Sequence, residues 1–293
     1  MRLSVQARAK INWTLDILGK RPDGYHELDM LMQSVTLCDQ MTFETAEELS
    51  LRVQKAGGRY VPADHRNLVL RAAEAFKKET GYTGGAKITL SKYIPVSAGM
   101  GGGSSDAAAT LQALNLLWQT NLSEKELEQV GLSIGADVPF CVQGGLQRAQ
   151  GIGEVLTPLP SKKPMWLLAL QPCRGLSTRD VFMQYTPSNA CKPDTKTAMD
   201  ALIRGDARKL GPALGNVLEP VACVLRPEIL EAIDALTAEG ACGARMTGSG
   251  SAVFGLFAQP GICRRAGDKL SKRWASCRMM RTASCGVVLR RND

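Results

Sequence analysis

Patterns that would point to a metal site, a membrane span or a disulfide framework are missing from this chain of 293 residues. It has two histidines, and none of its nine cysteines forms a Cys-x-x-Cys pair, so no zinc site is expected. No apolar run approaches the ~20 residues that a membrane helix needs, and the first residues lack the apolar core of a signal peptide. An odd number of scattered cysteines favours free thiols. We therefore expect a cytoplasmic protein without a membrane partner.

Aromatic residues are also scarce, at 5% of the chain, whereas basic residues give a formal net charge of +8. This charge favours anionic partners such as nucleotides or nucleic acid. The basic residues gather late in the chain, but aromatic residues do not interleave with them as they do in proteins that stack single-stranded bases. A solvated basic face is the preferred interpretation, and no nucleic-acid partner is expected. The residues concerned are Lys269, Lys272, Arg273, Arg278, Arg281, Arg290 and Arg291.

The most informative segment is glycine-rich and spans residues 94–106, Ile-Pro-Val-Ser-Ala-Gly-Met-Gly-Gly-Gly-Ser-Ser-Asp. Glycines let a backbone approach a ligand and adopt the positive φ angles that aim successive N–H groups inward. Apolar residues then recur at helical spacing as far as Trp118, with Ser104, Ser105 and Asp106 as candidate N-caps. Because a helix N-terminus attracts anions, the segment predicts a polyphosphate cradle rather than a flexible turn.

Two familiar phosphate motifs do not fit this cradle. It lacks the Gly-Lys-Ser/Thr ending of a P-loop, and no strand follows its glycines as in a protein-kinase loop. The pattern Pro-x-x-x-Gly-x-Gly-Gly-Gly-Ser-Ser instead resembles the phosphate motif of the GHMP kinases, a family of small-molecule kinases. The resemblance implies ATP as cofactor, with Mg²⁺ as its companion. The ATP-binding residues that it implies are Pro95, Val96, Ser97, Ala98, Gly99, Met100, Gly101, Gly102, Gly103, Ser104 and Ser105.

Residues 10–17 alternate between apolar and polar, which predicts a strand. If its apolar face packs on the core, Lys10 and Asn12 point away from it. A lysine on such a face is usually only solvated. The family resemblance nevertheless implies that Lys10 belongs to the catalytic centre and Asn12 to the substrate site.

A turn at residues 19–24, Gly-Lys-Arg-Pro-Asp-Gly, leads directly into Tyr25 and His26. Taken alone, these would be a structural tyrosine and a surface histidine. Together with Ala-Lys-Ile-Asn at residues 9–12, the segment resembles the branch of the family that phosphorylates a cytidine diphosphate-linked methylerythritol. That resemblance implies that Tyr25 and His26 hold the cytosine base, with Phe182 as a third wall of the pocket. A core position for Phe182 is the equal alternative.

Asp137 is a carboxylate in the apolar segment Gly-Ala-Asp-Val-Pro-Phe, which follows a helix predicted from a capping box at Ser123. Buried carboxylates are rare unless they are paired or functional, although a helix cap would explain Asp137 equally well. The segment again resembles the family, and the resemblance implies that Asp137 is the catalytic base. Arg148 departs from the small residues expected there and could either alter substrate contacts or point outward.

The resemblance implies an α+β fold with an N-terminal domain of the ribosomal S5 domain 2-like type and a ferredoxin-like C-terminal domain. A proline-rich stretch near residues 156–164 suggests the boundary, so we expect domains at 1–158 and 159–293. In the second domain the pattern predicts helices near 195–204, 228–238 and 261–274, and a last strand near 283–290.

Two further segments carry weaker signals. Residues 245–254 contain a second glycine loop that runs into a strand, and family resemblance implies that this loop packs beside the phosphate site. Residues 216–219, Asn-Val-Leu-Glu, are similar to a family segment, but no role follows from the sequence.

The sequence thus predicts a kinase that transfers the γ-phosphoryl group of ATP to a hydroxyl group of a small cytidyl substrate. Such transfer depends mainly on positioning and on stabilising charge. Another GHMP kinase, of the mevalonate or homoserine type, is the nearer alternative. A nucleic-acid-binding module is the more distant one, because it would leave Lys10, Asp137 and the glycine loop without a shared purpose.

Overall fold

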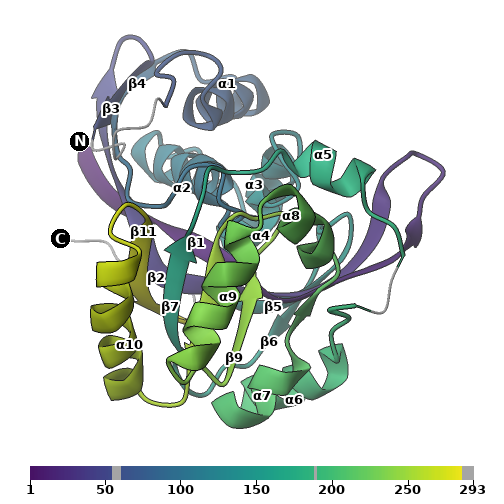
Figure 1. The fold of residues 1–293 in the computed structure, drawn as a ribbon. Coiled ribbons are helices and arrows are strands. Elements are labelled where there is room, and N and C mark those ends of the chain that lie inside the picture. The colour runs from purple at the N-terminus through teal and green to yellow at the C-terminus, as the bar shows by residue number, and fades with distance from the viewer. Residues whose placement is uncertain (55–60, 188–189, 286–293) are drawn as a thin grey trace.

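A long antiparallel pair of strands, β1 (Arg2–Lys20) and β2 (His26–Ala46), forms the centre of the larger of two sheets (Figure 1). The computed structural model describes residues 1–54, 61–187 and 190–285. The turn predicted at residues 19–24 connects the pair, but Gly19 and Lys20 still belong to β1 and pair with β2. The expected strand at 10–17 is therefore confirmed as part of a longer one.

The larger sheet has the strand order β3-β4-β2-β1-β8, and β5 and β6 extend it beside the first half of β2. One of its strands, β8, comes from the second half of the chain and pairs in parallel with β1. The other strands are β3 (Ser50–Gln54), β4 (Gly85–Ser91), β5 (Leu146–Gly151), β6 (Val155–Leu159) and β8 (Gly215–Asn216).

The smaller sheet is antiparallel, with the order β11-β7-β10-β9. Numbered within this sheet, the order is 4-1-3-2, and helices join its first strand to its second and its third to its fourth. This is the arrangement of a ferredoxin-like domain, as expected. The strands are β7 (Trp166–Gln171), β9 (Gly243–Met246), β10 (Val253–Phe257) and β11 (Arg278–Ala283).

Helix α2 (Gly102–Leu117) packs against β1 and is flanked by α1 (Leu68–Thr80), α3 (Glu124–Leu132) and α4 (Val138–Gln143). Asn67 caps α1, and the predicted capping box at Ser123 is present. The remaining helices are α5 (Thr178–Met183), α6 (Thr195–Arg204), α7 (Ala207–Ala213), α8 (Glu219–Leu225), α9 (Glu228–Ala238) and α10 (Pro260–Arg273).

An apolar cluster joins the two sheets, and it changes the interpretation of β1. Trp13 on β1 meets Phe254 on β10 edge to face, with ring centroids 5.5 Å apart. The opposite face of β1 is covered as well, so Lys10 and Asn12 are only 4% and 1% exposed. Both residues line a cavity on the face opposite Trp13, as the alternation predicted, but the interpretation of such a lysine as only solvated was wrong. A single alternating strand does not reveal what tertiary packing lays over its polar face.

The strand predicted near residues 283–290 overlaps the last described strand only at Ala283. In the described chain β11 runs over Arg278–Ala283, and the part of the prediction from residue 286 onward lies outside the described residues. Most of β11 is only half-buried, so it shows no apolar run that would mark it. Among the residues that the structure covers, no helix is both long and apolar enough to span a bilayer.

Candidate functional site

A cavity of about 740 Å³ lies where the glycine-rich segment, β1, the loop after β9 and helix α5 meet. It collects most of the residues that the sequence singled out. Lys10, Asn12, Asp137, Phe182 and every residue from Pro95 to Ser104 line it. Tyr25, His26 and Ser105 are not among the lining residues.

The glycine loop is bent at positions that only glycine tolerates well. Gly99 has φ 76°, and a Cβ atom there would lie 2.1 Å from the carbonyl oxygen of Thr247. Gly101 has φ 66° and lies against the side chain of Lys10, whose Cγ would be 2.8 Å from an added Cβ. The Lys10 N–H donates to the Met100 carbonyl at 3.0 Å, so β1 holds the loop directly.

Helix α2 begins earlier than expected. Gly101 is its N-cap, in a left-handed conformation, and the helix starts at Gly102. Ser105 and Asp106 are not caps because their side chains serve tertiary contacts, with Ser105 Oγ donating to the Arg8 carbonyl. The first N–H groups of a helix lack partners within it, so the first turn of α2 offers free donors at the cavity wall.

Three polar side chains form the centre of the cavity. Lys10 Nζ donates to Asn12 Oδ1 at 2.8 Å and lies 3.4 Å from Asp137 Oδ2. Lys10 is buried, whereas the Asp137 side chain is 36% exposed. The structure therefore brings the predicted lysine and aspartate together, with the carboxylate open to the cavity. A base must be accessible to a substrate hydroxyl, so this arrangement suits proton transfer.

The helix-cap alternative for Asp137 is only partly correct. Asp137 occupies the N-cap position of α4, but its side chain makes no capping hydrogen bond. Its carboxylate faces Lys10 instead. The neighbouring Cys141 thiol responds to this environment, because burial raises its pKa and the Asp137 carboxylate raises it further.

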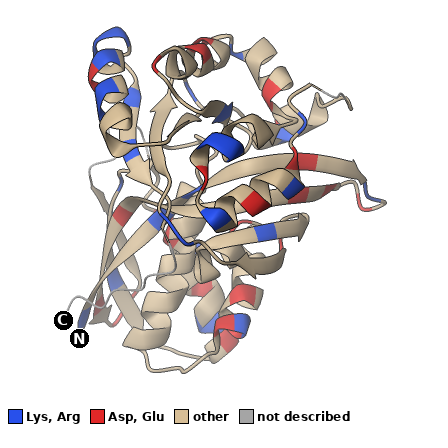
Figure 2. Ribbon diagram, turned by 90° about the horizontal axis from the view of Figure 1, so that it is seen from below, with Lys and Arg blue, Asp and Glu red and all other residues tan. Residues whose placement is uncertain are grey.

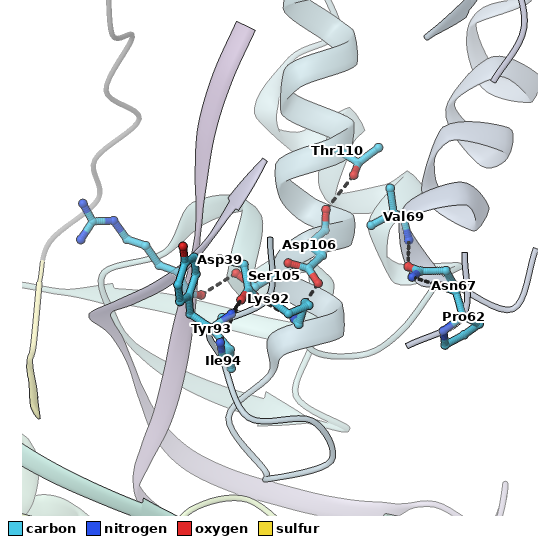
Figure 3. A network of polar contacts seen from close by, with 11 residues as sticks. Asp39, Pro62, Asn67, Val69, Lys92, Tyr93, Ile94, Ser105, Asp106 and Thr110 are labelled. Atoms are coloured by element: carbon cyan, nitrogen blue, oxygen red, sulfur yellow. Dashed lines mark hydrogen bonds and ion pairs between the residues drawn. The ribbon is translucent and has the colours of Figure 1, made fainter. Parts of the chain in front are cut away.

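A buried charge network, which the sequence did not reveal, holds both ends of the glycine loop (Figure 3). Lys92 lies between two carboxylates and donates to Asp39 on β2 and, at 2.7 Å, to Asp106 on α2. Asp39 also accepts from the N–H groups of Tyr93 and Ile94, at 2.5 and 2.8 Å. The chain entering the loop and the helix leaving it are thus tied to the same lysine.

Burial disfavours the charged form of Lys92, but Asp106 and Asp39 together raise its pKa. For Asp106 burial is the larger effect and raises the pKa, which Lys92 opposes and Asp39 reinforces. Two carboxylates surrounding one buried ammonium group therefore hold that ammonium charged.

The second glycine loop packs on the first, as expected. The Thr247 hydroxyl accepts from the Asn12 N–H at 3.0 Å, and the Ala252 N–H donates to the Ala98 carbonyl at 3.0 Å. An added Cβ at Gly248 would lie 2.8 Å from the Gly99 carbonyl oxygen. Thr247 is a site residue that sequence reasoning missed, since the signal there was only a short glycine turn.

Of the three residues expected to hold the cytosine base, two are in contact with each other. His26 packs on Phe182, with ring centroids 5.4 Å apart, and Phe182 lines the cavity. His26 also meets Tyr185, which the sequence analysis did not consider, at 6.2 Å and edge to face. Tyr25 is 61% exposed and is not among these ring contacts. Phe182 thus lines the cavity and also packs against an apolar core cluster, so its role beside a cytosine base stays a prediction.

Charge outside the cavity is mixed (Figure 2), with Lys and Arg alternating with Asp and Glu over many elements. Arg148 donates two hydrogen bonds to the Asp29 carboxylate, from Nε to Oδ1 at 2.8 Å and from Nη2 to Oδ2 at 2.9 Å. It does not line the cavity and points away from it. In the late basic segment, Lys269 pairs with Glu239 and Arg281 with Asp268.

Comparison with known proteins identifies the family of the chain. Residues 67–145 match the GHMP kinases N terminal domain, and residues 198–276 match the GHMP kinases C terminal domain. The chain is 44% identical to 4-diphosphocytidyl-2-C-methyl-D-erythritol kinase of Pelotomaculum thermopropionicum (strain DSM 13744 / JCM 10971 / SI) over 293 residues, 99% of this chain and 98% of the relative. It is 43% identical to the enzyme of that name from Geobacillus kaustophilus (strain HTA426), over 88% of this chain and 89% of the relative.

A crystal structure of 4-(cytidine 5'-diphospho)-2C-methyl-D-erythritol kinase superposes with a TM-score of 0.83 and 35% identity, covering 97% of this chain and 100% of that one. A homoserine kinase from Cytophaga hutchinsonii ATCC 33406, at 19% identity and a TM-score of 0.75, covers 97% of this chain and 95% of its own and shares the fold alone. The two domain matches and the near full-length identity show that the chain belongs to the 4-diphosphocytidyl-2-C-methyl-D-erythritol kinase family of the GHMP kinases.

Proposed function

We propose that this kinase transfers the γ-phosphoryl group of ATP to the 2-hydroxyl of 4-diphosphocytidyl-2-C-methyl-D-erythritol, in the non-mevalonate route to isopentenyl diphosphate. The observation that carries the proposal is the 3.4 Å separation of Lys10 Nζ and Asp137 Oδ2 beside the glycine loop. The same names on relatives covering nearly the whole chain support the choice of substrate.

The proposed step is a direct phosphoryl transfer. The substrate hydroxyl oxygen forms a bond to the γ-phosphorus, the bond from that phosphorus to the bridging oxygen breaks, and ADP leaves with the electron pair. Asp137 accepts the hydroxyl proton, late in a loose transition state. Lys10 offsets the negative charge beside the transferred group and, through Asn12, orients the hydroxyl.

The phosphates occupy the cradle from Pro95 to Ser105, where N–H groups of the loop and of the first turn of α2 donate to their oxygens. Ser105 contributes through its backbone position, since its hydroxyl is engaged with Arg8. The cytosine base lies beside Phe182, which lines the cavity, and the adjoining His26. Asn12 and Lys10 line the same cavity.

Mg²⁺ would arrive bound to ATP. No group of three or more His, Cys, Asp and Glu side chains that could hold a metal occurs within residues 1–54, 61–187 and 190–285. The ion fits nevertheless, because Mg²⁺ usually binds through substrate phosphates, waters and one or two carboxylates, and Asp106 and Asp137 line the cavity. When bound, the ion supplies neutralisation of phosphate charge. A cytoplasmic location belongs to the same proposal and is supported by nine cysteines that are all free thiols.

A coupled assay of ADP release with Mg-ATP tests the proposal, with mevalonate and homoserine as competing acceptors. We expect turnover with the cytidyl substrate alone. Turnover with another alcohol and not with the cytidyl substrate would keep the cradle and Asp137 but refute the substrate. Absence of turnover with all of them, from folded protein, would refute the proposed activity.

A further inference from the structure

The segment Asn216–Glu219, for which the sequence offered no role, lies between strand β1, which carries Lys10, and the second glycine loop. Asn216 is the last residue of β8, which pairs in parallel with β1, and the Val217 N–H donates to the Leu15 carbonyl at 3.1 Å. Asn216 and Glu219 are 1% and 5% exposed. Two buried polar side chains at this place require partners, since an unpaired buried polar group costs free energy.

Asn216 donates both hydrogens of its side-chain amide to carbonyl groups of the second glycine loop. Its Nδ2 donates to the Met246 carbonyl at 2.9 Å and to the Gly248 carbonyl at 2.8 Å. Its Oδ1 accepts from the Leu218 N–H at 3.0 Å, which fixes the orientation of the amide. The two carbonyls flank Thr247, so the amide group bridges the backbone on either side of that residue.

Glu219 holds the same loop from its strand side. Its Oε2 accepts from the Met246 N–H at 2.7 Å, and its Oε1 accepts from the Cys191 thiol at 3.3 Å. Between them, Asn216 and Glu219 therefore engage both the N–H and the carbonyl of Met246. Neither residue lines the cavity, so neither touches the reacting groups directly.

Thr247 transmits this position to the active centre. Its hydroxyl accepts from the Asn12 N–H at 3.0 Å and lies 3.4 Å from the Gly99 carbonyl. Asn12 in turn accepts from Lys10 Nζ at 2.8 Å. A continuous set of contacts thus runs from Asn216 and Glu219 through Thr247 to the lysine that faces Asp137.

We infer that Asn216 and Glu219 are positioning residues for phosphoryl transfer, which fix the second glycine loop so that Thr247 holds Asn12 and Lys10 in register with the phosphate cradle. The inference rests on the proposed function. It adds that residues from the second half of the chain fix the geometry of Lys10 and Asn12, which belong to the first half. Small misplacements of reacting groups are costly, because effective positioning is a large part of the rate.

The test compares Asn216→Ala with Asn115→Ala as a matched control. Asn115 clamps another loop in the same way, accepting from Leu122 N–H at 2.8 Å and donating to Leu122 O at 2.8 Å, but it does not line the cavity. We expect Asn216→Ala to lower kcat per folded molecule about 10- to 100-fold, as for a misplaced catalytic group, and Asn115→Ala to leave it unchanged. An unchanged kcat in Asn216→Ala would overturn the inference.

A second arm separates positioning from general stability. Thr247→Val removes the hydroxyl at nearly constant volume, and its loss of kcat should overlap with that of Asn216→Ala, so that the double variant is no slower than the slower of the two single variants. Fully additive losses would contradict transmission through Thr247.

Should Asn216→Ala fail to fold, two substitutions of Glu219 still test whether these residues position the loop. Glu219→Gln keeps an acceptor for the Met246 N–H and should retain turnover, whereas Glu219→Met keeps the volume without the acceptor and should lower kcat. Equal turnover in both would overturn the role of Glu219.

The last arm distinguishes this inference from the proposed function. If the wild-type enzyme does not phosphorylate the cytidyl substrate, the proposed function fails, and calorimetric binding of Mg-ADP becomes the measurement. Asn216→Ala should then weaken Mg-ADP binding relative to the wild type and to Asn115→Ala, because Gly248 and Gly250 line the cavity against Gly99. Equal affinities would overturn the inference as well.

Discussion

The two ends of the cavity are built in different ways. The phosphate end consists of backbone held by buried groups: glycines pressed against Thr247 and Lys10, and a lysine enclosed by Asp39 and Asp106. The base end consists of side chains at the surface, with His26 packed on Phe182 and Tyr25 mostly exposed. The comparison teaches that the first region is fixed by buried contacts, whereas the second rests on half-buried and exposed side chains. Under the proposed function the first serves the chemistry and the second the selection of the substrate.

The largest expected effect follows from removing the candidate proton acceptor, Asp137, beside the phosphate end. Asp137→Asn keeps the shape of the side chain but not its basicity, and we expect kcat to fall by about 10²- to 10⁴-fold, the usual contribution of a general base. Both substrates should still bind, and the protein should fold normally because the Asp137 side chain caps no helix. Steady-state kinetics and calorimetric binding check this; a retained kcat would remove Asp137 from the reaction.

The next largest effect is expected on stability, from Lys92→Met. Removing this buried ammonium leaves two carboxylates facing each other without compensation, which typically costs about 3–5 kcal/mol. Denaturant unfolding measures the loss. The control is Lys269→Met, which breaks the largely exposed pair with Glu239 and should change the free energy of unfolding by less than about 1 kcal/mol. Similar losses in the two variants would show that the network does not stiffen the phosphate end.

The base end is tested by His26→Ala, which should raise the KM for the cytidyl substrate and blur the choice between cytosine and uracil, with little change in the KM for ATP. A pocket that pairs with the edge of a base rejects the wrong base because its polar groups would be left unpaired. The measurement is kcat/KM for the cytidyl and uridyl forms of the substrate. Unchanged discrimination would refute the role of His26.

The smallest expected effect is a pH dependence at Glu219, which lies behind the second glycine loop. Burial raises its pKa above 4.5, although the Met246 N–H and Arg245 oppose this. Folding therefore favours its protonated form. The resulting stability is complete below pH 4.5 and is lost as pH rises through the folded-state pKa. Relative to Glu219→Gln, the wild type should lose stability over that interval in thermal unfolding.

Glu126 offers a control of opposite sign. Hydrogen bonds from Ser123 lower the pKa of its carboxyl group, so its contribution is present above pH 4.5 and is lost as pH falls through the lowered value. Relative to Glu126→Gln, the wild type should therefore lose stability toward acid. The same slope in both comparisons would contradict the assignment for Glu219.

Local patterns were sufficient where neighbours in sequence carry the physics. The capping box at Ser123 and the helices at 195–204 and 228–238 were predicted because each depends on residues within a turn or two. The helix start at residues 104–106 was wrong because those polar side chains were already used elsewhere, Asp106 by Lys92 and Ser105 by Arg8. The domain boundary near residue 158 remains a prediction.

By itself the sequence determined the glycine-rich loop before a helix, because spacing and residue type carry that information locally. Its resemblance to the GHMP kinases added Asp137 as the candidate base and Tyr25, His26 and Phe182 as candidates for the cytosine pocket. Only the tertiary structure decided that Lys10 is buried beside Asp137, that Lys92 ties the loop at both ends, and that Asn216 and Glu219 hold the loop carrying Thr247. These contacts join residues far apart in the chain. Which residues meet in these contacts depends on how the two sheets pack on one another, and no local sequence pattern contains that information.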